Sequence, residues 1–279
     1  MEKVSIYVPV YNAEKTISQV IDSIKSQSFK FDEIIIVNDC SNDNSAEIIN
    51  LHPNIKKINN SHNKGLSYCR NIAIKNSKNE IVAGIDADVV LDKNWLENIM
   101  QDLKNDTIMC GGNLIEKYIE NKYNKWRSIY YRQNWGNKNL KDPPFLYGCN
   151  TIQKKTAWHA VGGYDEKLRS NGEDVDYCNR LSKLDNHKIS YNNNAKCYHL
   201  QDDDLNSLSK RVWRYHSYGY KIKKPSMYRF LKLIIKQFKF FSMRVKDDIS
   251  NLDSKNFLIN LFVLINFIKL ELKRTLEDK

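Results

Sequence analysis

Two carboxylates, Asp86 and Asp88, directly follow the apolar run Ile81 to Ile85 in the segment IVAGIDADVVLD. Side chains alternate along a strand, so both carboxylates would point to the same side wherever the chain remains extended. Two like charges held that close repel each other, and their burial is unfavourable unless a cation compensates. The other interpretation is a solvated strand end, because an Asp-x-Asp pattern alone occurs often by chance.

A second acidic group, formed by Glu173, Asp174 and Asp176, lies in the segment GEDVDYCNRL. The residues from Asp174 to Leu184 are typical of a helix, which would place these carboxylates at its N-terminus. A helix N-terminus favours negative charge and would help to keep Asp174 ionised. Taken alone, the group is equally well explained as a capped and charged helix start.

Alternating strands and helices are expected to position these groups. The pattern predicts strands at residues 4–8, 33–37, 55–58, 81–85 and 107–110, and helices at residues 17–24, 41–50, 65–76 and 95–103. Such alternation indicates an α/β fold, Rossmann-like, with a mostly parallel sheet and helices on both faces. Ligands bind beyond the carboxyl ends of the strands in these sheets. Polar residues cluster at those ends, namely Tyr11, Asn12, Asn38, Asp39, Asp86 and Asp88.

The regular pattern stops between residues 114 and 147, where aromatic residues are frequent. They are Tyr118, Tyr123, Trp126, Tyr130, Tyr131 and Trp135. Aromatic rings could form a platform for a ligand, although such residues more often belong to a core. Further along the chain, residues 148–153 predict another strand, and residues 196–200 an extended segment.

Composition and charge limit the classes of function. The six cysteines are scattered without a Cys-x-x-Cys pair, which favours reduced cytosolic thiols over a zinc site or a disulfide framework. No secretory signal pattern precedes the first expected strand. Of the net charge of +11, residues 221–279 contribute +8, with 14 Lys and Arg against 6 Asp and Glu. The remaining residues are nearly balanced, which argues against a nucleic-acid enzyme.

The basic C-terminal segment predicts an amphipathic helix at residues 228–246. One stripe holds Phe230, Leu231, Ile234, Ile235, Phe238, Phe241 and Val245, and another holds Arg229, Lys232, Lys236 and Lys239. A helix of this kind can lie in the plane of an anionic bilayer, where each Lys or Arg contributes about 1 kcal/mol. The alternative is that the segment packs on the rest of the protein. The apolar run at residues 257–268 is too short to span a membrane.

Several ordered motifs between about residues 3 and 215 resemble those of the family 2 glycosyltransferases, inverting enzymes with the GT-A fold. The matching segments are VSIYVPVYNAEKTI, IIIVNDCSNDNS, NKGLSYCRNIAI, IDAD, GGYDEKL with GEDVDYCNRL, and YHL. Two positions depart from the family pattern, because Asn38 replaces the usual first Asp and Cys40 the usual Gly. These changes put the nucleobase preference in doubt more than the activity.

The resemblance implies a role for individual residues. Asp174 would be the catalytic base, and Asp88 and His199 would hold Mn²⁺ or Mg²⁺. The donor-binding residues would be Pro9, Tyr11, Asn12, Glu14, Asp39, Lys64, Arg70, Asp86, Ala87 and Asp88. The acceptor-binding residues would be Gly148, Asn150, Glu173 and Trp135.

The resemblance also implies an organisation and a function. Residues 1–113 would form the nucleotide-sugar-binding half of a GT-A domain, residues 114–220 its acceptor-binding and catalytic half, and residues 221–279 a basic helical tail. The enzyme would move a sugar from a nucleoside-diphosphate sugar, with UDP favoured, to a hydroxyl of a glycan or lipid-linked acceptor. It would be cytoplasmic and peripherally bound to the inner face of the cell membrane, in bacterial-type surface glycan assembly. The alternatives are a catalytically silent binding protein of the same fold and a nucleotidyltransferase.

Overall fold

The computed structural model describes residues 2–104, 106–184, 188–217, 225–250 and 254–277. The chain divides into two compact units: unit 1 comprises residues 1–117 and 133–200, and unit 2 comprises residues 118–132 and 201–279. These two units are defined by the contacts within the chain. The division expected from the sequence is instead defined by donor binding, acceptor binding and the tail, and it stays a prediction. Its boundary at residue 220 lies outside the described residues.

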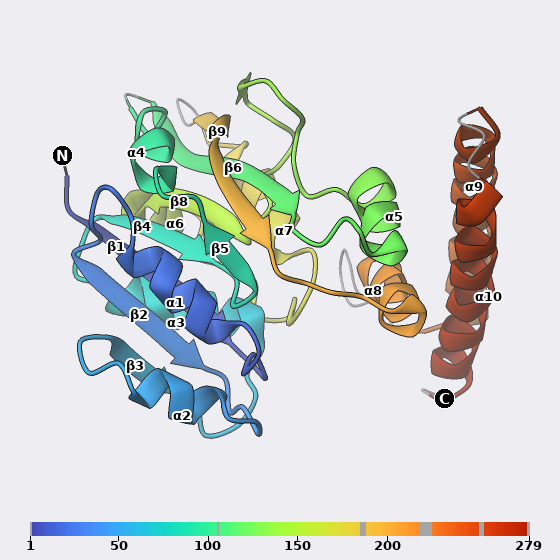
Figure 1. Ribbon diagram of the computed structural model, residues 1–279, viewed down its shortest axis with the longest axis horizontal. Coiled ribbons are helices and arrows are strands. Elements are labelled where there is room, and N and C mark those ends of the chain that lie inside the picture. Colours follow the sequence, from blue (N-terminus) through green and yellow to red (C-terminus); the bar gives the residue numbers. More distant parts are fainter. Residues whose placement is uncertain (1, 105, 185–187, 218–224, 251–253, 278–279) are drawn as a thin grey trace. The chain divides into compact units, whose positions relative to one another are not determined.

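Unit 1 is built on one sheet (Figure 1), whose described strands follow the order β3-β2-β1-β4-β8-β6-β9-β5, with β7 paired to β9. The strands are β1 Val4–Val10, β2 Glu33–Asn38, β3 Lys56–Asn59, β4 Ile81–Ile85, β5 Val89–Leu91, β6 Thr107–Glu116, β7 Leu140–Lys141, β8 Asn150–Lys154 and β9 Lys188–His199. Strands β3, β2, β1 and β4 are parallel, and β8 lies antiparallel between β4 and β6. The parallel half therefore carries the carboxyl ends at which the polar residues were expected.

Helices cover both faces of the sheet. They are α1 Ile17–Lys25, α2 Ser45–Asn50, α3 Leu66–Asn76, α4 Trp95–Met100, α6 Lys155–Ala160 and α7 Glu173–Leu181. Alternation along β1 sends Ile6 and Val8 into a core shared with α1, α2 and α4. Tyr7 points into the opposite core, which it shares with α3, α6 and α7. The predicted α/β class with helices on both faces is confirmed.

The aromatic segment is more regular than its sequence indicated. Strand β6 continues to Glu116, and α5 (Lys122–Tyr130) lies within the aromatic run. Asn121 caps this helix, because its side chain accepts a hydrogen bond from the backbone of Tyr123 at 2.9 Å. Trp126 is fully buried in the core of unit 2. This part of the aromatic segment is therefore core, as the alternative interpretation expected.

Unit 2 consists of α5, α8 (Leu205–Ser217), α9 (Met227–Ser250) and α10 (Ser254–Glu277). The last two helices form an antiparallel hairpin (Figure 1), so the predicted helical tail is confirmed. Within the described residues, no helix is both long enough and apolar enough to cross a membrane.

The inner face of α9 is polar. Arg244 is buried, lies 5.2 Å from the centre of the Trp126 ring, and donates a hydrogen bond to the hydroxyl of Tyr131 at 2.8 Å. Asp248 accepts hydrogen bonds from Tyr130 at 2.5 Å and from Asn260 at 2.6 Å. These directional contacts fix which face of α9 points inward, and they leave several large apolar side chains of the helix exposed.

We expect unit 2 to loosen in mild acid because of His216. Burial, with the positive charges of Lys236 and Arg244, lowers the pKa of His216 to about 4. The neutral ring can then accept a hydrogen bond from the Tyr131 hydroxyl, 2.9 Å away. Since an unfolded His has a pKa of about 6.5, this stabilisation is present above pH 6.5 and is lost as the pH falls to 4, up to about 3 kcal/mol.

The loss of stability can be measured by hydrogen exchange of the backbone amides in peptides from α9, after correction for the intrinsic pH dependence of the exchange rate. Protection should fall between pH 7 and pH 4.5 in the unmodified protein and change much less in His216→Gln. An equal loss of protection in both proteins would show that other groups titrate.

Candidate active site

Two loops at the carboxyl ends of β1 and β2 hold each other in place. Asn12 adopts a positive φ of 53°, and its side-chain oxygen accepts a hydrogen bond from the backbone of Asn42 at 2.9 Å. The carboxylate of Glu14 accepts one from the backbone of Asn44 at 3.0 Å. Tyr11 is exposed above these loops, whereas Pro9 is buried within β1. Among these residues predicted to bind the donor, the side chain of Tyr11 is therefore accessible to a ligand. Asn12 and Glu14 also hold the two loops together.

Asp39 organises the loop that leads into α3. Its carboxylate is buried and accepts hydrogen bonds from the backbone of Lys64 and Gly65, both at 2.8 Å, and from the side chain of Asn60 at 2.7 Å. Gly65 has a φ of 94°, a conformation that favours glycine, and α3 begins directly after it. Contact of Asp39 with a nucleobase stays a prediction, whereas its hold on this loop is observed.

The acidic pair that follows β4 is divided between two partners. The strand ends at Ile85, so the chain already turns where the carboxylates occur. Asp86 accepts a hydrogen bond from Arg70 at 3.1 Å, and Asp88 lies 3.3 Å from Nε2 of His199. Burial and the charge of Asp88 raise the pKa of Asp86, although Arg70 opposes this shift. Each carboxylate thus has its own basic neighbour.

His199 ends β9 and is held by a second carboxylate. Its Nδ1 donates to Glu116, whose Oε2 is 3.1 Å away, and its Nε2 faces Asp88. Burial disfavours the charged ring, but Asp88 and Glu116 outweigh this and raise the pKa of His199 to about 9. Glu116 was not among the residues predicted for the site. It carries the same signal as Asp86, a carboxylate at the end of an apolar strand.

Asp88 and His199 suit a divalent cation, although no cluster of three or more His, Cys, Asp or Glu side chains that could hold a metal occurs among the described residues. They offer one carboxylate oxygen and one imidazole nitrogen 3.3 Å apart. The contact with Glu116 fixes the ring so that Nε2 points to the site, which is how ligating histidines are usually oriented. A cation such as Mg²⁺ commonly uses few protein ligands and completes its shell with water and substrate phosphates. Asp88 and His199 are therefore suitable ligands for such a cation.

Arg70 joins the acidic pair to the start of α7. The side chain is 2% exposed, and it places one guanidinium nitrogen 3.1 Å from Asp86 and another 3.2 Å from Glu173. Gly148 leaves the space for it, because a Cβ there would lie 1.9 Å from Arg70. Both side chains are buried and pair with each other, so donor contact by Arg70 and acceptor contact by Glu173 stay predictions.

Asp174 lies beside this ion pair, at the second residue of α7. One of its carboxylate oxygens accepts a hydrogen bond from the backbone of Val175 at 2.8 Å, and the other accepts one from Gly148 at 3.1 Å. The side chain remains partly exposed. Glu173 is buried, and burial together with Asp174 raises its pKa to about 7 against the effect of Arg70. The N-cap residue of α7 is Gly172, so Asp174 charges the first turn of the helix without capping it, and its side chain is also accessible for chemistry.

The predicted acceptor residues do not form one surface. Asn150 is 1% exposed and accepts a hydrogen bond from the indole of Trp95 at 2.7 Å, so it lies in the core, and its contact with an acceptor stays a prediction. Gly148 packs against Arg70 and makes room for it. Trp135 is half-buried, donates to the carbonyl of Phe145 at 2.7 Å, and stays a predicted acceptor contact.

We expect Arg70→Lys to lower the transfer rate about ten- to a hundredfold. A lysine keeps the positive charge but cannot bridge two carboxylates as the planar guanidinium does. Since Arg70 reaches the reacting groups only through Asp86 and Glu173, kcat should fall more than the affinity for the donor. Steady-state kinetics with the exposed Arg132→Lys as the control measures both. A change confined to KM would place Arg70 in direct contact with the donor.

The fold and the site define a glycosyltransferase of the GT-A type. The profile described as Glycosyl transferase family 2 matches residues 5–161. The chain therefore belongs to glycosyl transferase family 2, whose members are inverting enzymes.

Curated relatives are named glycosyltransferases and glycan synthases. The chain is 23% identical over 237 residues to glucosyl-dolichyl phosphate glucuronosyltransferase of Haloferax volcanii, covering 78% of this chain and 75% of that protein. It is 29% identical over 235 residues to poly-beta-1,6-N-acetyl-D-glucosamine synthase of Staphylococcus epidermidis, covering 80% of this chain. The chain spans only 56% of the length of that synthase.

Solved structures show the same fold. Mannosyltransferase PcManGT from Pyrobaculum calidifontis, in complex with GDP-Man and Mn²⁺, has a TM-score of 0.60 at 15% identity, with 100% of this chain and 88% of that chain covered. S. aureus TarS 1–349 in complex with UDP-GlcNAc has a TM-score of 0.59 at 19% identity, with 84% and 66% covered.

Proposed function

We propose that the protein transfers a sugar from a nucleoside-diphosphate sugar to an acceptor hydroxyl, with Mn²⁺ or Mg²⁺ bound by Asp88 and His199. One observation carries the proposal: a buried Arg70 links the acidic pair after β4 to the helix start that bears Asp174. This linkage would hold the proposed cation site and the accessible carboxylate of Asp174 within one unit, near the carboxyl ends of the parallel strands. Structural neighbours in complex with UDP-GlcNAc and GDP-Man support a nucleotide-sugar donor.

The donor would lie against the loops after β1 and β2. Tyr11 is exposed there, and Lys64 lies at the loop that Asp39 holds. Asp86 would contact the donor ribose or sugar, with Arg70 fixing its orientation, and Ala87 would approach the donor through the turn after β4. Thr16 holds this turn by donating to the carbonyl of Ala87 at 2.7 Å. We favour UDP as the nucleotide.

The reaction requires a proton acceptor and a stabilised leaving group. The acceptor oxygen attacks C1 of the sugar, and Asp174 takes the hydroxyl proton. The bond from C1 to the diphosphate oxygen breaks, and its electron pair leaves with the nucleoside diphosphate. When bound, the cation supplies Lewis-acid stabilisation of the charge on that diphosphate. The hydrogen bond from Gly148 holds the Asp174 carboxylate in position for the proton.

A panel of nucleotide sugars tests this proposal. The full chain would be incubated with each donor and Mn²⁺, and the released nucleotide would be identified. Release of nucleoside diphosphate supports sugar transfer or slow donor hydrolysis. Release of pyrophosphate would point instead to a nucleotidyltransferase, and no turnover with any donor would favour a silent binding protein.

The acceptor is proposed to be a glycan or lipid-linked hydroxyl at the cytoplasmic face of the membrane, in surface glycan assembly. Relatives named for dolichyl phosphate and polysaccharide products support this acceptor class. Helix α9 supports the membrane surface, because Leu231, Ile235 and Phe238 are each half or more exposed. Lysines at residues 232, 236 and 239 are also exposed on this helix. Apolar and basic side chains together suit an anionic bilayer surface.

We expect the full chain to sediment with vesicles that contain anionic lipid, and less so as salt is added, because ions screen exposed charges over about 8 Å at physiological ionic strength. Leu231→Glu should lower capture about tenfold, since it removes an apolar contact worth roughly 1.5–3 kcal/mol and adds a repelled charge. Leu51→Glu makes the same change at a residue of unit 1 that is 77% exposed, and it should have little effect. Equal capture of both variants would contradict attachment through α9.

A further inference from the structure

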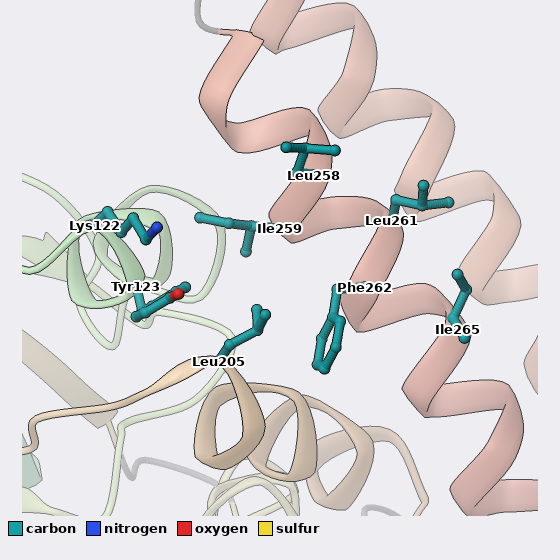
Figure 2. A pocket seen from close by; sticks show the side chains of 8 residues that line it. All are labelled: Lys122, Tyr123, Leu205, Leu258, Ile259, Leu261, Phe262 and Ile265. Carbon is teal, nitrogen blue, oxygen red and sulfur yellow. The ribbon is translucent and has the colours of Figure 1, made fainter.

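An apolar groove lies within unit 2, between α5, α8 and α10 (Figure 2). Its volume is about 510 Å³, which is in the range of ligand-binding pockets. Tyr123, Leu205, Ile259 and Phe262 converge on the space between the three helices, and Lys122 lies at its edge. Apart from this lysine, the side chains that line the groove are aliphatic or aromatic.

The groove opens onto an apolar face of α10 that the described part of unit 2 leaves uncovered. Leu258 is 69% exposed and Ile265 is 56% exposed, although both line the groove. Leu272 and Leu276 are exposed further along the same face. Contiguous apolar surface of this kind on a soluble unit marks a place where another apolar group binds.

Charge indicates what that group carries. Unit 2 contains 21 Lys and Arg against 10 Asp and Glu, whereas unit 1 contains 23 against 23. The entire net charge of +11 therefore belongs to the unit that has the groove. Lys122 lines the groove, and Lys125 is exposed one turn further along α5. The three carboxylates that precede Leu205 already have partners within unit 2. Asp202 accepts a hydrogen bond from the side chain of Asn121 at 2.7 Å, Asp203 pairs with Arg127, and Asp204 accepts one from the backbone of Ser207 at 2.7 Å.

We propose that this groove holds one hydrocarbon chain of an anionic membrane lipid, with its head group beside Lys122 and Lys125. The proposal extends the membrane attachment proposed for α9, and it rests on that attachment and not on the donor site. A second copy of the chain is a poorer occupant, because two units that each carry a charge of +11 would repel each other.

Soluble single-chain probes test the groove directly. Dodecyl phosphate, kept below its critical micelle concentration, should bind the full chain with a stoichiometry of one in titration calorimetry. Dodecyl phosphocholine has the same chain without net charge and should bind at least tenfold more weakly. Inorganic phosphate, which lacks the chain, should give no measurable heat. Equal binding of the two amphiphiles, or none, would overturn the proposal.

Two matched variants locate the binding. Ile265→Glu places a carboxylate in the groove at an exposed position and should weaken dodecyl phosphate binding at least tenfold. Leu276→Glu changes a residue that is 53% exposed on the same helix but outside the groove, and it should bind the probe normally. Equal affinities in these two variants would overturn the proposal. So would a dimer, seen by light scattering, that Ile265→Glu dissociates and dodecyl phosphate does not.

Failure of this proposal can be told apart from failure of the proposed function. If the unmodified chain releases nucleoside diphosphate but does not bind dodecyl phosphate specifically, only the proposal of a lipid-binding groove is contradicted. If the chain binds dodecyl phosphate specifically but turns over no nucleotide sugar, lipid binding in the groove is supported and the proposed transferase activity is contradicted.

Discussion

Asp88→Asn is expected to lower metal-dependent donor turnover by about a thousandfold or more. The amide keeps the shape of the side chain but removes the charge that a divalent cation requires. His199 would then offer its Nε2 to a site without a carboxylate, since Asp88 is the carboxylate that this nitrogen faces at 3.3 Å. Donor turnover should be measured at matched and at saturating Mn²⁺.

Asp106→Asn provides the control for this substitution. It removes the same charge from an exposed residue of unit 1 and should leave turnover unchanged. Turnover by Asp88→Asn equal to that of the control, at the same Mn²⁺ concentration, would show that the cation does not bind at Asp88.

Asp174→Asn is expected to lower transfer by about a hundredfold or more while the donor still binds. The amide oxygen can still accept the hydrogen bond from Val175, so the start of α7 should be preserved. The amide cannot take the proton of the acceptor hydroxyl. The transfer rate, measured from product formation, should therefore fall, whereas the donor affinity, measured by calorimetry, should stay nearly unchanged.

The same helix offers a matched control in Asp176, which is partly exposed and pairs with Arg180 at 2.8 Å. Asp176→Asn removes a carboxylate near the helix N-terminus and should change transfer by no more than a few-fold. Parallel loss of donor affinity and transfer in Asp174→Asn would assign Asp174 a binding or structural role. Equal losses in the two variants would reduce its role to that of a negative charge in the first turn of α7.

The sequence was sufficient to predict the element types of unit 1 because its hydrophobic periods are clear. The strand at residues 81–85 and the helix at residues 65–76 agree with β4 and α3 to within a residue. The position of β8, antiparallel between β4 and β6, had no local signal, since strand order depends on contacts between distant segments. Helix α5 was missed because its buried residues, such as Trp126, pack against α8 and α10, which are distant in the sequence.

The candidate site was predictable at the level of residues and less so at the level of roles. Asp88 and His199 lie 3.3 Å apart, because Asp88 directly precedes β5 and His199 ends β9, which pairs with β5; their binding of a cation stays a prediction. Arg70 and Glu173 were predicted to bind the donor and the acceptor because the sequence does not show that both side chains are buried. Only the fold shows that these two bind each other. The apolar stripe of α9 was visible in the sequence, but the polar inner face that leaves part of it exposed depends on Tyr130, Tyr131 and Asn260.

The central claim is that Asp88 and His199 hold the cation that binds the donor diphosphate. A crystal of the full chain grown with Mn²⁺ and UDP, measured for anomalous scattering by manganese, tests it most directly. We predict one anomalous peak within about 2.5 Å of a carboxylate oxygen of Asp88, of Nε2 of His199 and of a diphosphate oxygen. UDP bound in the site with the manganese peak elsewhere, or with His199 still directed only at Asp88 and Glu116, would contradict the account.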